Sequence, residues 1–77
     1  MNASGYLIND AALHTGQWKS LVVNEDCVID SLLIDGVEVV GDMNYTGNTI
    51  TATMYIRAKG GQYITGVELA SGSVLMY

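Results

Sequence analysis

Hydrophobic and polar residues alternate with a period of two along most of this chain, which is the pattern of half-buried β-strands. Residues 49–57 give the clearest example, because they also contain many β-branched and aromatic residues. Every second residue along this segment is apolar, and these residues share one face: Ile50, Ala52, Met54 and Ile56. Residues 49–57 therefore predict one continuous strand with an apolar face.

Two further strands are predicted after this segment. Residues 62–69 alternate in the same way, and Gly60-Gly61 lies between the two runs. Because glycine readily takes positive φ, the connection predicts a hairpin. Ser71-Gly72 predicts another turn, after which residues 73–77 form the last strand.

The first half of the chain repeats this organisation. Strands are predicted at three segments: 17–23, 27–34 and 37–40. Asn24-Glu25-Asp26 separates the first two, and Asp35-Gly36 predicts a tight hairpin between the last two. The start of the chain allows two alternatives, a helical turn at residues 9–13 or an edge strand at residues 6–8.

These short strands and regularly spaced turns predict an all-β fold. We expect a compact antiparallel sandwich or barrel of about six or seven short strands. No linker or change in composition divides the sequence, so residues 1–77 are expected to form a single β domain.

The composition predicts self-association. The chain has 77 residues, of which 49% are hydrophobic and only 14% charged, whereas charged residues usually make up about 25%. A domain of this size has a small core and usually needs a disulfide, a metal or a partner chain. Cys27 is the only cysteine and His14 the only histidine, so neither an internal disulfide nor a closed zinc site is expected. Oligomerisation or attachment to something larger therefore remains as the expected source of stability.

The charge argues against two classes of partner. The net charge is −5, and the only basic residues are Lys19, Arg57 and Lys59. Three basic residues are too few to neutralise the phosphates of a nucleic acid. The same shortage of positive charge disfavours binding to an anionic membrane surface. The beginning of the chain has neither a basic region nor a long apolar run, so we expect no signal peptide and no membrane span, and assembly in a cytoplasm.

No residue set predicts catalysis or a bound metal. We expect His14 to be a surface polar residue, although Asp10 is the nearest acid that could orient it as a general base. Cys27 follows two acids, which would raise a thiol pKa, and is expected in the core. The clustered acids do not form a calcium-binding loop. Trp18 and the tyrosines could stack on sugars or bases, but filling the core or an interface is the more common role of such residues.

The end of the chain resembles a group of small structural proteins from tailed bacteriophages, of the head-decoration or head-fibre type. Those proteins often end in a stretch like F-T-x-I-x-L-x-S-G-x-V-x-x-Y, and this chain ends in Y-I-T-G-V-E-L-A-S-G-S-V-L-M-Y from Tyr63 to Tyr77. Residues 16–21 and 26–32 also resemble a pair of strands found early in those proteins. The resemblance implies a non-enzymatic virion component without cofactors that forms a homotrimer. Its implied partners are its own copies and other virion proteins such as the major capsid protein.

The apolar residues of the predicted strands 49–57 and 73–77 together exceed what one small core should need. One of these two sets is therefore expected to face a partner copy. The predicted oligomer interface contains Ile50, Met54, Ile56, Val74, Leu75 and Tyr77. Two other classes stay open: a small carbohydrate- or receptor-binding β module, and a cytoplasmic enzyme subunit or inhibitor.

Overall fold

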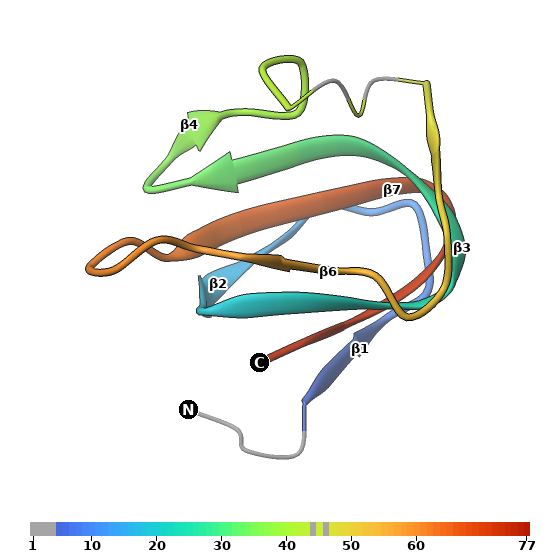
Figure 1. Ribbon diagram of the computed structural model, residues 1–77, viewed down its shortest axis with the longest axis horizontal. Coiled ribbons are helices and arrows are strands. Elements are labelled where there is room, and N and C mark those ends of the chain that lie inside the picture. The colour runs from blue at the N-terminus through green and yellow to red at the C-terminus, as the bar shows by residue number, and fades with distance from the viewer. Residues whose placement is uncertain (1–4, 44, 46) are drawn as a thin grey trace.

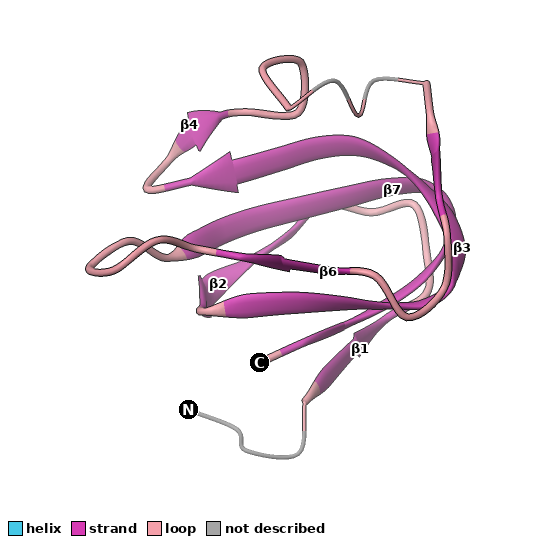
Figure 2. Ribbon diagram, in the orientation of Figure 1, coloured by secondary structure: helices cyan, strands magenta, loops and turns pink. Residues whose placement is uncertain are grey.

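Seven antiparallel strands form one sheet in the computed structural model, which describes residues 5–43, 45 and 47–77. The strands are β1 (Tyr6–Ile8), β2 (His14–Trp18), β3 (Ser20–Ile34), β4 (Val37–Glu38), β5 (Thr49–Ile50), β6 (Tyr55–Arg57) and β7 (Ile64–Met76). The described residues contain no helix (Figure 2), so the all-β prediction is confirmed. The edge strand expected at the start of the chain is β1, and the alternative of a helical turn is wrong.

Two of the strands are long, and both bend. β3 has 15 residues and β7 has 13, and they pair along most of their length. Their register shifts repeatedly on both sides of Val28, and such bulges bend a strand. The sheet therefore turns back over itself, and the two halves of each long strand lie in different layers (Figure 1). The predicted sandwich is confirmed, but its strands are not all short.

The two layers are organised in the same way, each with the two long strands between two short ones. In the first, the order is β1-β7-β3-β6; in the second, it is β2-β7-β3-β4. β5 pairs with β3 beside the bend. The outer strands of each layer are consequently short, while the two long strands occupy the centre of both.

Close approach of backbone to backbone explains the bend. Gly72 has φ +83°, and a Cβ there would lie 2.6 Å from the Cα of Cys27. The buried Ser73 hydroxyl accepts a hydrogen bond from the Asn24 side chain and donates one to Glu25. Two sequence predictions are wrong here: residues 24–26 do not separate two strands, and Ser71-Gly72 is not a turn. The polar residues and the glycine mark the bend of continuous strands.

The Asp35-Gly36 hairpin is confirmed. Asp35 has φ 50° and Gly36 has φ 78°, and positive φ at both central residues is the signature of a type I′ turn. Ile34 faces Val37 across it. β4 ends at Glu38, earlier than the predicted residue 40.

Residues 49–57 do not form one strand. β5 and β6 flank a turn in which Thr53 has φ 73°, and both strands pair with β3. The N–H of Thr53 donates to the carbonyl of Val23, whose own N–H donates to the carbonyl of Met54. These bonds hold the turn against the bend of β3, which a straight strand could not follow.

The connection at Gly60-Gly61 is a turn but not a hairpin. The N–H of Gln62 donates to the carbonyl of Lys59 at 2.8 Å. However, β6 pairs with β3 and not with β7, so the connection leads from one layer to the other. Local alternation does not indicate which strand becomes the neighbour, and this prediction is wrong.

A single core cluster lies between the layers, because side chains from both halves of β3 and β7 belong to it. Cys27 is completely buried in this cluster, as predicted. Burial raises the pKa of the Cys27 thiol, and the charge of Asp26 adds to the effect. The side chains of Trp18, Ile34, Val39 and Tyr45 cover the edges of the cluster.

Candidate functional site

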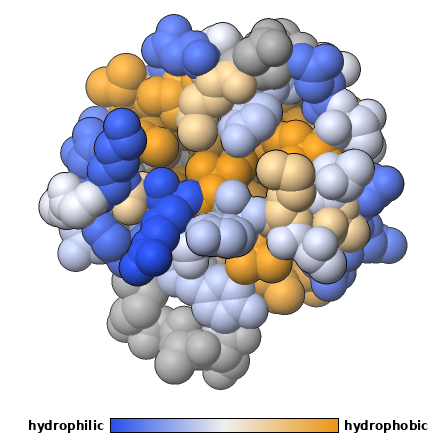
Figure 3. Space-filling model, in the orientation of Figure 1, coloured by the Kyte–Doolittle hydropathy of each residue, from blue (hydrophilic) through white to orange (hydrophobic). Residues whose placement is uncertain are grey.

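The strands β4 and β6 are each paired with β3 on one side only, and a space lies between them. A hollow of about 440 Å³ lies there, lined by apolar Ile34, Val37, Val39 and Met43 together with Arg57 and Lys59. We call these six residues the open seam. Figure 3 shows hydrophobic surface between hydrophilic side chains on this face of the molecule.

A second hollow of about 340 Å³ continues from the seam and shares Met43 with it. Its lining includes Tyr45, Ile50 and Met54. Together the two hollows give an extended apolar surface beside β4, β5 and β6.

The cations of the protein gather around the open seam. Arg57 and Lys59 line one wall, and within the described part of the chain neither forms an ion pair. Asp35 and Asp42 line the same hollow. Lys19 is held nearby, where its Nζ donates to the carbonyl of Gln62 at 2.6 Å and lies 4.7 Å from the centre of the Tyr63 ring. The hollow thus combines an apolar floor with charged side chains of both signs.

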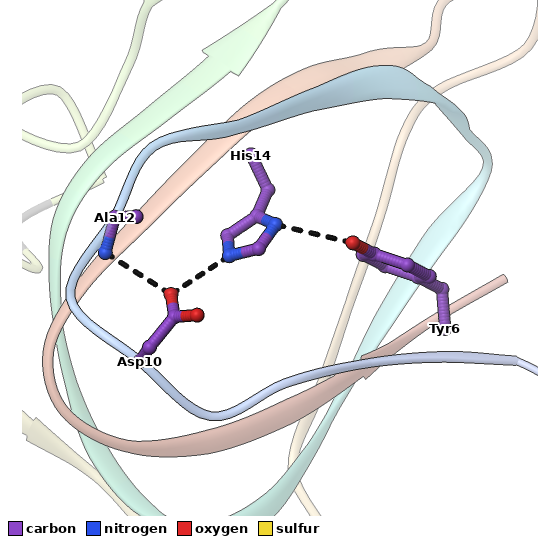
Figure 4. A network of polar contacts seen from close by, with 4 residues as sticks. All are labelled: Tyr6, Asp10, Ala12 and His14. Carbon is purple, nitrogen blue, oxygen red and sulfur yellow. Dashed lines mark hydrogen bonds and ion pairs between the residues drawn. The ribbon is translucent and has the colours of Figure 1, made fainter.

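The other side of the sheet carries a polar network (Figure 4). His14 Nε2 lies 2.8 Å from Asp10 Oδ1, and its Nδ1 lies 3.3 Å from the Tyr6 hydroxyl. The same carboxylate oxygen of Asp10 accepts the N–H of Ala12. Hydrogen bonds from His14 and Ala12 lower the pKa of Asp10 below its ordinary value. The network fastens the loop between β1 and β2 to both strands.

Aromatic stacking continues this contact. The Tyr6 ring stacks on Trp18 with centroids 6.0 Å apart and planes 19° apart. Tyr6 therefore joins β1 of one layer to β2 of the other and closes this side of the sandwich. The carboxylate–imidazole–phenol order can hold the imidazole in one orientation and pass a proton along it. The Asp10 side chain is 57% exposed, so water competes for each step.

The structure does not bring the predicted interface residues together on one surface. Ile50, Ile56 and Val74 are buried in the chain's own core, where they have almost no surface to offer a partner. Leu75 and Tyr77 are half-buried. Met54 is 48% exposed and lines the second hollow. Of the predicted set, only these last three retain surface for another copy.

Sequence reasoning missed several large apolar side chains that remain exposed. Val37 is 62% exposed and Leu13 50%. Both lie next to turns, where alternation is too short to distinguish an inner from an outer face. The sequence alone could not predict the open seam, because its hollow is lined by two segments that are separated in the chain, residues 34–43 and 57–62.

Within the described residues, no group of three or more His, Cys, Asp or Glu side chains is placed to hold a metal ion. That part of the chain also contains no helix long and apolar enough to cross a membrane. Comparisons with protein-family models, curated proteins and solved structures give no match.

Proposed function

We propose that this chain is a non-enzymatic structural protein of a phage virion, capsid-decorating or fibre-associated, which assembles as a homo-oligomer on the particle surface. The observation that carries the assembly part of this proposal is the placement of the large apolar side chains that remain exposed: Tyr6, Leu7, Leu13, Val37, Met43, Met54, Tyr55 and Tyr63. They belong to β1, β4, β6 and the loops beside these strands, at the open edges of the sheet.

Open edges of this kind favour association. An exposed edge strand offers unpaired N–H and C=O groups, and monomeric proteins usually protect such edges with charges, proline or bulges. β1 has the sequence Tyr-Leu-Ile, with none of these charges or prolines. Contact with another chain would cover both its backbone groups and its apolar side chains.

The virion role and the trimeric state rest on the resemblance of residues 63–77 to small phage structural proteins. This segment is β7 with one residue on each side, and β7 pairs with strands of both layers. Other virion proteins, such as the major capsid protein, would be the external partners.

Sedimentation and particle analysis together test this function. At micromolar concentration the chain should sediment as an oligomer, and its peptides should be detected by mass spectrometry in purified particles of the phage that encodes it. A stable, folded monomer would overturn the assembly role. An oligomer that is missing from purified particles would overturn the virion role alone.

The open seam supports a second candidate, a small carbohydrate- or receptor-binding module. Its volume of about 440 Å³ falls within the usual range of small-molecule sites, roughly 300–1,000 Å³. A glycan array separates the two candidates, since specific binding that is lost in Arg57→Ala would favour this alternative.

A further inference from the structure

The turn at Asp35-Gly36 is the one place in the sequence where an aspartate or an asparagine precedes a glycine. Such a pair is chemically distinctive, because glycine has no side chain to shield its backbone nitrogen from the carboxyl group of the residue before it. Both residues are exposed, and nothing lies within 4 Å of the place that a Cβ of Gly36 would take. The pair is therefore sterically open to a reaction between its own side chain and backbone.

That reaction is an isomerisation, and water is its only co-reactant. The backbone nitrogen of Gly36 attacks Cγ of Asp35, an N–Cγ bond forms, and a C–O bond of the carboxylic acid breaks. The released hydroxyl and the proton of the nitrogen leave as water, and a five-membered succinimide ring results. When water adds to the former backbone carbonyl carbon of Asp35, the bond from that carbon to nitrogen breaks. The main chain then runs through Cβ and Cγ as an isoaspartyl residue of unchanged mass.

Hydrogen bonds from distant residues hold the atoms that would react. The N–H of Gly36 donates to the Thr65 hydroxyl at 2.8 Å. The Asp35 carboxylate accepts the N–H of Tyr63 at 3.1 Å, and the Asp35 N–H donates to the Tyr63 carbonyl at 2.9 Å. The Thr65 hydroxyl itself donates to the Leu33 carbonyl at 3.4 Å. The attacking nitrogen and the carboxyl group are thus tied to two different neighbours.

The shape of the turn also opposes ring closure. Asp35 and Gly36 have φ 50° and 78°, as a type I′ turn requires. To close the ring, the Cα–C bond of Asp35 must rotate until the nitrogen of Gly36 turns toward the carboxyl group. That rotation would break the bond to Thr65 and disturb the pairing of Ile34 with Val37 across the turn.

We propose that Asp35-Gly36 is a site of spontaneous isomerisation and that the contacts from residues 63–65 suppress the reaction in the folded chain. An isoaspartyl residue would add one carbon atom to the main chain of a two-residue turn, so Ile34 and Val37 could not keep their register. Asp35 lines the hollow beside the open seam, and the modification would therefore also move a carboxylate of that hollow. This chemistry is independent of the proposed assembly.

The variant Thr65→Val tests the role of the hydroxyl, because valine keeps the shape of threonine and cannot accept the N–H of Gly36. Thr65→Ser is the matched control, since serine retains a hydroxyl. Each full-length chain is aged at neutral pH, and isoaspartate at residue 35 is quantified by peptide mass spectrometry and by isoaspartyl-specific enzymatic methylation. Circular dichroism establishes that each variant is folded, and Thr65→Ala replaces the valine variant if that one is not.

Losing one hydrogen bond of about 1 kcal/mol corresponds to a rate increase of about fivefold, which we expect for Thr65→Val. The serine variant should isomerise as slowly as the unaltered chain. The unaltered chain unfolded in guanidinium chloride should isomerise at least as fast as the valine variant. Asp30-Ser31 is an internal reference, since Asp30 is exposed but precedes a residue with a side chain, and it should stay unmodified in every sample.

Each part of the inference has its own contradicting outcome. If residue 35 forms no isoaspartate even in the unfolded chain, or no more than residue 30 does, the site is wrong. If the folded and unfolded chains isomerise at the same rate, the fold does not protect it. If Thr65→Val reacts like the unaltered chain, the hydroxyl does not hold the nitrogen, and the role given to residues 63–65 is overturned.

Discussion

At the scale of single residues, Gly72 is the position that least tolerates an added side chain. It combines a left-handed φ of +83° with a neighbouring backbone 2.6 Å from where its Cβ would be. Backbone atoms cannot rotate aside as a side chain can. Any side chain at this position must therefore displace β3 or straighten the bend of β7.

Gly72→Ala should be strongly destabilising. The left-handed conformation costs an L-residue about 1–2 kcal/mol, and forcing extra volume into a packed site adds about 1–3 kcal/mol. Urea unfolding followed by circular dichroism gives the change in the free energy of unfolding. Gly60→Ala is the control: nothing lies within 4 Å of its Cβ position and its φ is outside the left-handed region, so it should be neutral or gain about 0.4–1 kcal/mol. Equal effects of the two substitutions would contradict the close approach at the bend.

At the scale of the elements, Glu38 decides where β4 ends. Its carboxylate accepts hydrogen bonds from the Ser31 hydroxyl and from the N–H groups of Leu32 and Val40. A side chain thus occupies the place that the backbone of the next strand residue would take. The chain can then leave the sheet without an unsatisfied N–H on Leu32, whose side chain is buried.

Glu38→Ala should destabilise the protein by about 1–3 kcal/mol, the usual cost of leaving a buried donor unpaired. Hydrogen exchange should locate the effect, with faster exchange at Leu32 and Val40 than in the unaltered chain. Asp30→Ala provides the comparison, since Asp30 is exposed and such surface changes usually stay within about 0.5 kcal/mol. Unchanged protection at Leu32 would show that water replaces the carboxylate.

At the scale of the whole molecule, the pH dependence of stability follows from two carboxylates. Partial burial tends to raise the pKa of Glu38, but hydrogen bonds from Ser31, Leu32, Val40 and Val39 outweigh it and lower this pKa below its ordinary value. The pKa of Asp10 is lowered as well, by His14 and then by Ala12. A carboxylate with a lowered folded-state pKa stabilises the fold above its ordinary pKa, and this contribution is lost as pH falls through the folded-state pKa.

The melting temperature should consequently decrease as the pH is lowered below the ordinary carboxyl pKa, about 4. The variant Asp10→Asn/Glu38→Gln should melt earlier than the unaltered chain at neutral pH. The two curves should converge in acid, because the unaltered carboxylates are then protonated too. Calorimetry across this range measures both curves, with Asp30→Asn as the control. A difference that persists unchanged into acid would mean that packing, and not ionisation, accounts for it.

The sequence by itself determined the all-β class and the Asp35-Gly36 hairpin. Both depend on neighbours in the chain: alternation sets the two faces of a strand, and positive φ at adjacent residues sets a type I′ turn. It also identified Cys27 as a core residue, since a small apolar side chain in an alternating segment is usually buried.

How the strands join, and where surface is left open, depends on contacts between segments that are distant in the sequence. The glycine and polar residues at 71–72 and 24–26 are compatible with turns, and the pairing of β3 with β7 makes them a bend instead. The same pairing buries Ile50, Ile56 and Val74, which alternation alone could not distinguish from interface residues. The open seam likewise exists because β4 and β6 both pair with β3 and leave a space between them. Pairing between strands distant in sequence depends on the packing of the whole chain, and the period of any one segment does not contain it.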